Sequence, residues 1–238
     1  MSPEKTRRAI PHLGRLEFII VAAFLLCLLF FSIAYGRADE NGLLQLDQSL
    51  LESIHGSAPQ GLEPLMSAIT FLGSPAFLGG LVLVSLALLV WRKRWRSARL
   101  VFAVGLLTPM SIEGLKIVFH RTRPELWPRL PDASYSYPSG HALGSLVVYG
   151  VLAYLACQAY PRWRNAFLAG CAVLVALIGF SRLYLGLHWP TDVLGSWVSG
   201  SLLLFGLVYW HKQPTSSGVE RNFRRSLRDD KQVKSKEG

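Results

Sequence analysis

The sequence predicts an all-α, polytopic membrane protein with six transmembrane helices, and three observations support this prediction. Hydrophobic residues make up 51% of the 238 residues, while charged residues make up only 17%, below the share of about 25% that is typical of soluble domains. Apolar runs long enough to cross a bilayer recur along the chain. Finally, Lys and Arg gather in alternate connections between these runs, as the positive-inside rule expects.

Six apolar runs are predicted to span the membrane. The first, at residues 18–35, has a longer apolar core than a cleavable signal peptide and no clear small-x-small cleavage site after it, so we expect a retained anchor. Five further spans are predicted at residues 75–91, 100–119, 142–160, 166–187 and 190–210. We expect one domain over residues 1–215, with 1–16 as a cytoplasmic segment, followed by a basic, disordered cytoplasmic tail at 216–238.

The loop between the first two spans is predicted to hold two amphipathic helices. Residues 43–54 and 62–72 are apolar with interspersed polar residues, a pattern that suits helices lying in the membrane interface. Bordering a path for a lipid and packing on the protein surface are equally compatible with this pattern.

The placement of basic residues predicts that both termini are cytoplasmic. Nineteen of the 25 Lys and Arg residues lie in the amino-terminal segment, two turns and the tail, which a six-span chain places on one side. The first loop on the other side holds five acidic residues and only Arg37. Arg121, Arg123 and Arg129 depart from the rule because they lie in an outer loop. An anionic ligand explains them better than a solvated loop does.

Charge and cysteine content argue against two other classes. The net charge is +10, but the basic residues flank apolar runs and no nucleic-acid motif accompanies them, so no nucleic-acid partner is expected. Cys27, Cys157 and Cys171 lie inside apolar runs without ligand spacing. We therefore expect neither a disulfide framework nor a zinc site. The sequence leaves the oligomeric state open.

Three polar clusters fall at the outer ends of predicted spans. Charged groups in or near hydrocarbon are costly, so a converging set of them is a functional-site hypothesis by default. The set consists of Lys116, Arg123, Ser139, Gly140, His141, Arg182, His188 and Asp192. These residues place fixed cations, two imidazoles and a carboxylate at the ends of otherwise apolar membrane spans.

The spacing within the first two clusters predicts how they face the outer side. Lys116 and Arg123 are seven residues apart, so two helical turns would place both on one face, although an isolated Lys near a helix end often only snorkels. Ser139 is predicted to cap a helix whose first backbone N–H groups form an anion site. An ordinary serine cap is the simpler alternative.

The third cluster predicts a pairing across the start of the last span. Pro190 suits the first helical position, which places Asp192 in the first turn. There the carboxylate is expected to reach back to His188 and to orient its ring. The simpler alternative is that Asp192 only complements the helix dipole.

In order and spacing, these residues resemble the three-part signature of the type-2 phosphatidic acid phosphatase superfamily, which vanadium haloperoxidases share. The matching pieces are Lys116, six residues and Arg123-Pro124; Pro138-Ser139-Gly140-His141; and Ser181-Arg182, five residues, His188, three residues and Asp192. No signature position departs from the pattern over residues 116–192. The stretch 70–74 is also similar to bacterial members.

The resemblance implies hydrolysis of a phosphate ester or pyrophosphate on a lipid, without a metal or other cofactor. It makes His188 the nucleophile that forms a phosphohistidine, oriented by Asp192, and His141 the acid that protonates the leaving oxygen. The phosphoryl oxygens would be held by Lys116, Arg123, Ser139, Gly140 and Arg182. Fixed cations that spread negative charge suit phosphoryl transfer. The active site is expected on the extracytoplasmic face of the cell membrane.

The substrate and the acceptor remain open at this point. The candidate lipids are undecaprenyl pyrophosphate, phosphatidylglycerol phosphate and phosphatidic acid, and the compact six-span form favours the first two. Arg121, Arg129 and Tyr137 are candidates for head-group contacts. A lipid phosphotransferase would share the same intermediate, whereas a haloperoxidase is disfavoured because that chemistry occurs in soluble relatives. A non-catalytic lipid-binding or transport protein would not need both His141 and His188.

Overall fold

The computed structural model describes residues 43–57, 59, 61–125 and 134–213. Every regular element in that part of the chain is helical, and five helical segments there are long and apolar enough to cross a membrane. The prediction of an all-α, multi-pass protein is confirmed for these residues. The predicted first span at 18–35, the segment 1–16 and the tail at 216–238 lie outside them.

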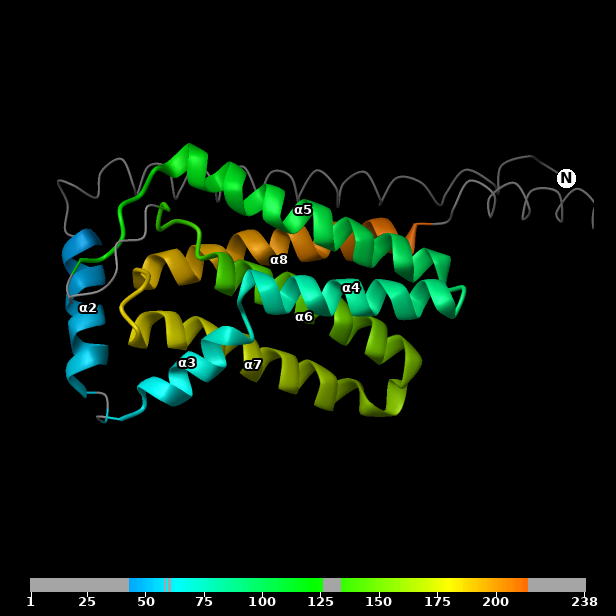
Figure 1. Ribbon diagram of the computed structural model, residues 1–238, viewed down its shortest axis with the longest axis horizontal. Coiled ribbons are helices and arrows are strands. Elements are labelled where there is room, and N and C mark those ends of the chain that lie inside the picture. The colour runs from blue at the N-terminus through cyan, green and yellow to red at the C-terminus, as the bar shows by residue number, and fades with distance from the viewer. Residues whose placement is uncertain (1–42, 58, 60, 126–133, 214–238) are drawn as a thin grey trace, which may run out of the picture.

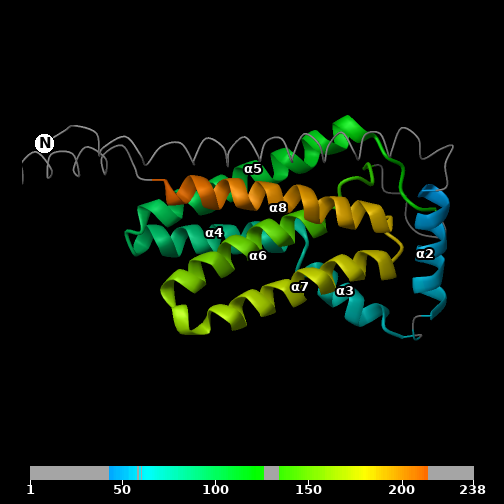
Figure 2. The ribbon, with the colours of Figure 1, turned by 180° about the vertical axis from the view of Figure 1, so that it is seen from behind.

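The helices follow the predicted apolar runs closely. They are α2 (Leu43–Ser57), α3 (Glu63–Phe71), α4 (Pro75–Trp91), α5 (Trp95–Phe119), α6 (Gly140–Ala159), α7 (Arg164–Tyr184) and α8 (Pro190–Lys212), with a 3₁₀ turn at Pro161–Trp163. Both segments predicted as amphipathic helices are helical, as α2 and α3. The long helices α4 to α8 run alongside one another, while α2 lies across one end of them (Figures 1 and 2).

Local sequence signals explain where two of the long helices begin. The Ser74 hydroxyl accepts a hydrogen bond from the backbone N–H of Phe77 at 3.2 Å, and Pro75 follows at the first helical position, where its missing N–H costs nothing. At α8, Pro190 takes the same position. Both helices therefore start where the sequence predicts.

The end of α5 agrees with the predicted span at 100–119, but the position of Arg123 differs from the prediction. The helix stops at Phe119 because His120 adopts a left-handed conformation, with φ of 46°, and donates its N–H to the Lys116 carbonyl. Arg123 lies beyond this cap in a non-helical segment. The expectation that Lys116 and Arg123 share one helix face was therefore wrong, and the two side chains reach the site from different local structures.

The core of the helix bundle lies where α4, α5, α6 and α8 meet. Its fully buried members include Leu100, Val104, Leu143 and Val147. Large apolar side chains also point outward, among them Leu83, which is 67% exposed. In a membrane protein such outward side chains contact lipid, so their exposure is consistent with the multi-pass assignment.

Candidate active site

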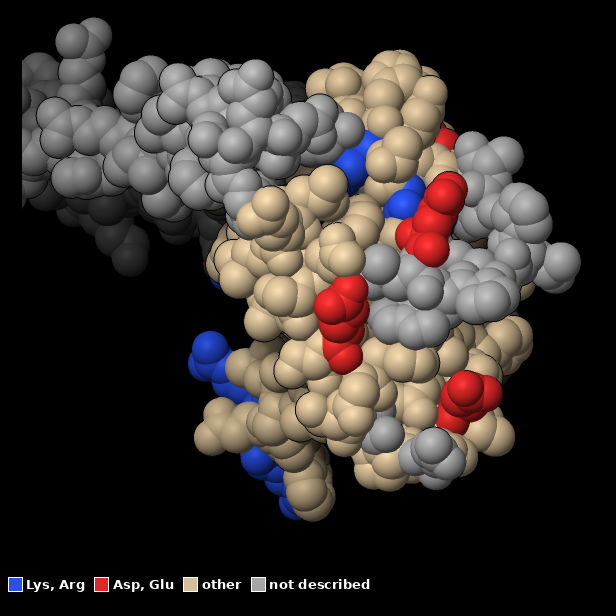
Figure 3. Space-filling view, turned by 90° about the vertical axis from the view of Figure 1, so that its left-hand side faces the viewer, with Lys and Arg blue, Asp and Glu red and all other residues tan. Residues whose placement is uncertain are grey.

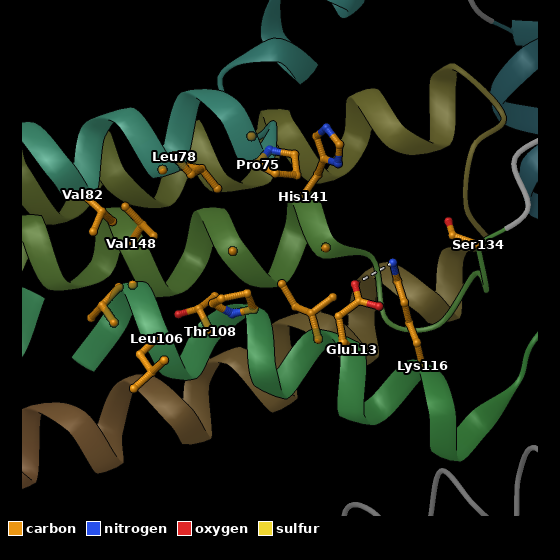
Figure 4. Close-up of a pocket in the computed structure, with 18 of the residues that line it drawn as sticks. Pro75, Leu78, Val82, Leu106, Thr108, Glu113, Lys116, Ser134, His141 and Val148 are labelled. Carbon is orange, nitrogen blue, oxygen red and sulfur yellow. Dashed lines mark hydrogen bonds and ion pairs between the residues drawn. The ribbon is translucent and has the colours of Figure 1, made fainter. Parts of the chain in front are cut away.

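A cavity of about 690 Å³ lies between α4, α5 and α6, close to the end of the bundle that α2 covers. Six of the eight predicted site residues line it, namely Lys116, Arg123, Gly140, His141, Arg182 and His188. Figure 4 shows Lys116 and Glu113 of α5 facing each other, with His141 of α6 across the cavity. Ser139 and Asp192 are fully buried and do not line the cavity.

His188 is fixed by a different partner at each ring nitrogen. Its Nε2 lies 3.3 Å from Nη1 of Arg123, and its Nδ1 lies 3.4 Å from Oγ of Ser136. A guanidinium can only donate, so Nε2 must carry the lone pair and Nδ1 the proton. The unprotonated nitrogen of His188 therefore lies on the side of the ring that meets Arg123.

The surroundings of His188 favour its neutral form. The ring is 2% exposed, and burial, the largest effect, lowers its pKa to about 4. Asp192 opposes this shift, while the positive charges of Arg182 and Arg123 reinforce it. At neutral pH the imidazole is therefore unprotonated and able to attack an electrophile.

Asp192 lies in the first turn of α8 and accepts hydrogen bonds from several donors. Its Oδ2 accepts from the backbone N–H of Trp189 at 2.9 Å and from the Ser136 hydroxyl at 2.5 Å. The distance from Oδ2 to Nδ1 of His188 is 3.6 Å, which is long for a hydrogen bond. The carboxylate of Asp192 thus faces His188, as predicted. Ser136 lies beside both, because its hydroxyl donates to the carboxylate and is also close to Nδ1 of the ring.

Arg121 has a role that the sequence prediction missed. It is 6% exposed, and its Nη1 and Nη2 each lie 2.6 Å from a carboxylate oxygen, of Asp192 and Asp47 respectively. Burial lowers its pKa, but the two carboxylates outweigh burial and raise the pKa above its ordinary value. The expectation of a head-group contact or an anionic ligand at Arg121 was wrong, because its anions belong to the protein.

The other two candidates for head-group contacts do not extend the site. Tyr137 is 3% exposed, and its hydroxyl lies 3.4 Å from that of Ser199, so the head-group contact expected of it was also wrong. Arg129 falls outside the described residues.

Hydrogen bonds to backbone carbonyl and hydroxyl groups help to hold the two arginines that line the cavity. Arg123 donates to the Ser134 carbonyl and hydroxyl and to the Leu187 carbonyl, at 2.8–3.0 Å. Nη1 of Arg182 donates to the Thr70 hydroxyl at 3.0 Å. These contacts hold both guanidinium groups at the wall of the cavity.

The start of α6 brings backbone N–H groups and His141 to the cavity. The Ser139 hydroxyl accepts from the N–H of Ala142 at 3.4 Å, which confirms the predicted cap. The turn before α4 packs directly against this start, because a Cβ at Gly73 would lie 3.3 Å from the His141 ring and 2.6 Å from Ile178. Only glycine fits at position 73 without displacing its neighbours.

Several contributors could not be found from the sequence pattern. Four residues that contact the site lie outside the recognisable motifs, namely Asp47, Glu113, Ser134 and Ser136. Most of them bond to residues distant in the sequence, and the contact of Glu113 with nearby Lys116 depends on the direction of both side chains. Within the described segments, no group of three or more His, Cys, Asp or Glu side chains is arranged to hold a metal ion.

Comparison with known proteins identifies the family. A family profile described as "PAP2 superfamily" matches residues 96–216. Phosphatidylglycerophosphatase B of Bacillus subtilis (strain 168) is 31% identical over 181 residues, which cover 74% of this chain and 89% of the relative. Undecaprenyl-diphosphatase of Sulfolobus acidocaldarius is 34% identical over 128 residues, covering 50% of this chain and 58% of the relative.

A solved structure supports the same assignment. The crystal structure of a transmembrane PAP2 type phosphatidylglycerolphosphate phosphatase from Bacillus subtilis aligns with a TM-score of 0.70 and 30% identity, over 80% of this chain and 94% of that one. The family profile, the relatives and the fold agree with the residues gathered at the cavity. This chain therefore belongs to the PAP2 superfamily and is a hydrolase of that superfamily.

Proposed function

We propose that this protein hydrolyses a phosphomonoester or pyrophosphate bond of a membrane lipid through a phosphohistidine intermediate on His188. The single observation that carries this proposal is the state of His188, which is buried, neutral and oriented with its Nε2 lone pair beside Arg123. A nucleophilic imidazole needs an unprotonated nitrogen next to groups that stabilise the charge of the transition state. His188 meets both requirements.

In the first step, Nε2 of His188 attacks phosphorus, and the bond from phosphorus to the leaving oxygen breaks. Lys116, Arg123 and Arg182 line the same cavity and would spread the negative charge on the phosphoryl oxygens. His141 gives a proton to the leaving oxygen. The proton on Nδ1 of His188 faces Ser136 and Asp192, which stabilise the positive charge that develops on the ring.

In the second step, water attacks the phosphohistidine and releases phosphate. His141, now neutral, accepts a proton from that water, and Nε2 of His188 regains its lone pair. We expect no divalent metal to be needed, because three fixed cations already occupy the places where charge develops. Ser139 would contribute through the helix start that it caps rather than through its buried hydroxyl.

The walls of the cavity favour a lipid as the substrate. Away from the histidines the cavity continues along apolar residues of α4 and α5, including Leu78, Val82, Phe102 and Leu106. The alkyl chains of a lipid would pack against these side chains. The names of the relatives favour phosphatidylglycerol phosphate and undecaprenyl pyrophosphate as substrates, and phosphatidic acid is the third candidate.

Charge distribution supports placing the site on the extracytoplasmic face. The end of the bundle away from α2 carries the basic connections between α4 and α5 and between α6 and α7. Exposed aromatic residues gather at the same end, namely Trp91, Trp95, Tyr160, Trp163 and Trp210. At the α2 end, acidic side chains lie at the surface while Lys and Arg are recessed (Figure 3). The basic end suits the cytoplasmic side.

A phosphate-release assay with purified protein in detergent tests the proposed function. We expect phosphate from at least one of the three candidate lipids, with full activity in EDTA and inhibition by vanadate, which mimics the phosphoryl group in the transition state. Loss of turnover in EDTA that a divalent metal restores would contradict the metal-free mechanism. A parallel reaction with an added lipid acceptor would reveal a phosphotransferase, because phosphate would then appear on the acceptor.

A further inference from the structure

The helix α2 buries an aspartate, which is unusual for a helix that lies on a surface. Along the helix, Asp47 and Leu51 are the fully buried side chains among those described, one turn apart, while most of their neighbours are exposed. A surface helix normally buries apolar residues, and an isolated buried carboxylate costs several kcal/mol. Asp47 therefore requires a specific partner to be tolerated.

The partner is Arg121, and the pair continues directly to the active-site carboxylate. Nη2 of Arg121 lies 2.6 Å from Oδ2 of Asp47, and Nη1 lies 2.6 Å from Oδ1 of Asp192. Thr191 closes the arrangement, since its N–H donates to Oδ1 of Asp47 at 3.0 Å and its hydroxyl also contacts Asp47. One guanidinium thus joins a carboxylate of α2 to the carboxylate beside the proposed nucleophile.

The two oxygens of Asp192 have separate tasks in this arrangement. Oδ1 is bonded to Arg121, while Oδ2 meets Ser136, the Trp189 N–H and the side of His188 that carries its proton. Any change in the position of Arg121 therefore turns the oxygen that faces His188. Arg121 is absent from the lining of the cavity. Its side chain therefore reaches the reaction through Asp192, while its backbone carbonyl accepts the N–H of Ser136 at 2.7 Å.

We propose that Asp47 and Arg121 are positioning residues, and that α2 holds Arg121 so that the Asp192 carboxylate orients His188. This inference rests on the proposed function, because it assigns the two residues to the step in which His188 attacks phosphorus. A simple anchoring role for the Asp47–Arg121 pair would affect folding but not the chemical step in particular. The two roles are therefore separable by kinetics.

The test measures kcat and KM for Asp47→Asn in full-length protein, with Glu52→Gln as the matched control on an exposed position of α2. Phosphate release is normalised to folded protein by gel filtration in detergent. We expect Asp47→Asn to lower kcat about tenfold with KM unchanged. In metal sites, loss of a residue that orients a ligand costs about ten- to a hundredfold, and the expected effect lies near the lower end of that range. Wild-type kcat in folded Asp47→Asn would overturn the inference.

A double-mutant cycle with Asp192→Asn decides whether Asp47 acts through Asp192. In single-turnover phosphorylation, Asp47→Asn should have little further effect once Asp192→Asn is present. An equal loss in both backgrounds would show a general structural role and overturn the inference. Where Asp47→Asn does not fold, Asp47→Glu, which retains the charge but changes its position, goes through the same cycle.

A pH profile of Arg121→Gln provides a second readout. The charged and titratable groups around His188 are Asp192, Arg182, Arg123 and His141. Removal of the Arg121 charge leaves the negative charge of Asp192 less neutralised, which should raise the pKa of His188. The acidic limb of kcat should therefore move to higher pH. An unchanged limb would contradict the inference. Inactivity of the wild-type protein on all three lipids would instead contradict the proposed function, and so the two failures are distinguishable.

Discussion

His188 and Lys116 meet at one cavity but are held in contrasting ways. His188 is 2% exposed and belongs to a buried network with Ser136, Asp192 and Arg121. The Nζ of Lys116 lies 3.2 Å from Oε1 of Glu113, its ion-pair partner. The side chain of Lys116 is 16% exposed and that of Glu113 is 66% exposed. A buried network resists rearrangement, whereas an exposed ion pair contributes little and exchanges readily. The proposed nucleophile is thus fixed before substrate binds, while Lys116 can leave Glu113 for a phosphate.

The largest effect should come from changes in the buried network around His188. His188→Ala is expected to reduce phosphate release below detection, because no neighbouring group can replace the attacking nitrogen. Asp192→Asn should leave a folded enzyme that is slower by roughly a hundred- to ten-thousandfold, since an orienting carboxylate tunes a nucleophile rather than replacing it. Wild-type-like release by folded His188→Ala would overturn the assignment of the nucleophile.

The burial of His188 also predicts an unusual pH dependence of the rate. Because burial lowers the pKa of His188 to about 4, the ring stays neutral until the pH falls to that value. On the acidic side the rate should therefore decline about tenfold per pH unit only below about pH 4, and on the basic side it should fall as His141 loses the proton that it gives to the leaving oxygen. The same shift means that His188 contributes stability above the unfolded-state pKa of about 6.5, which is lost as pH falls toward 4.

Rate measurements across this range need a control for unfolding. Samples held at low pH and returned to neutral pH should recover their activity if titration alone lowers the rate. A reversible acidic limb near pH 6.5 would show that the nucleophile is not a buried neutral imidazole.

A smaller effect is expected at the apolar wall of the cavity. Gly79 lines the cavity and has open space beside it, whereas Gly80 also has open space but does not line the cavity. Gly79→Leu should displace part of a bound chain and so remove its packing contacts with the wall, which raises KM about five- to tenfold. Gly80→Leu is the matched control, and a short-chain soluble phosphate should be less affected. Equal KM changes in both variants would contradict a lipid-binding wall.

The smallest effect should come from the exposed ion pair. Glu113→Gln removes the anion that competes with the substrate for Lys116, so KM should fall about two- to fivefold with kcat unchanged, in keeping with the small free energy of exposed pairs. Glu52→Gln, an exposed acid on α2, serves as the control. A fall in kcat in Glu113→Gln would indicate that Glu113 takes part in the chemical step.

The sequence predicted much of the fold and the cavity because both depend on local signals. Apolar runs determined the helices from α4 to α8, and the caps at Ser139 and Pro190 placed the starts of α6 and α8 correctly. The end of α5 at Phe119 was predicted correctly, but Arg123 was wrongly expected on the same helix face as Lys116. The left-handed conformation of His120 separates the two, and residue type alone does not predict that conformation.

The buried network was beyond reach for a different reason. Asp47 is 74 residues from Arg121 in the chain, and no spacing rule connects an amphipathic helix with a loop so distant. Arg121 was expected to contact an anionic ligand or a lipid head group, because charge placement says nothing about burial. Tertiary packing alone makes it an internal partner of two carboxylates.

The most direct test of the central claim is to trap the covalent intermediate. Enzyme mixed with a lipid that carries a radiolabelled phosphoryl group is quenched within the first turnover, and the labelled peptide is identified. We predict one label per active site, on His188, stable in base and labile in acid as expected for a phosphoramidate, and absent in His188→Ala. Phosphate release in a single-turnover experiment without any labelled protein, or a label on another residue, would contradict the mechanism.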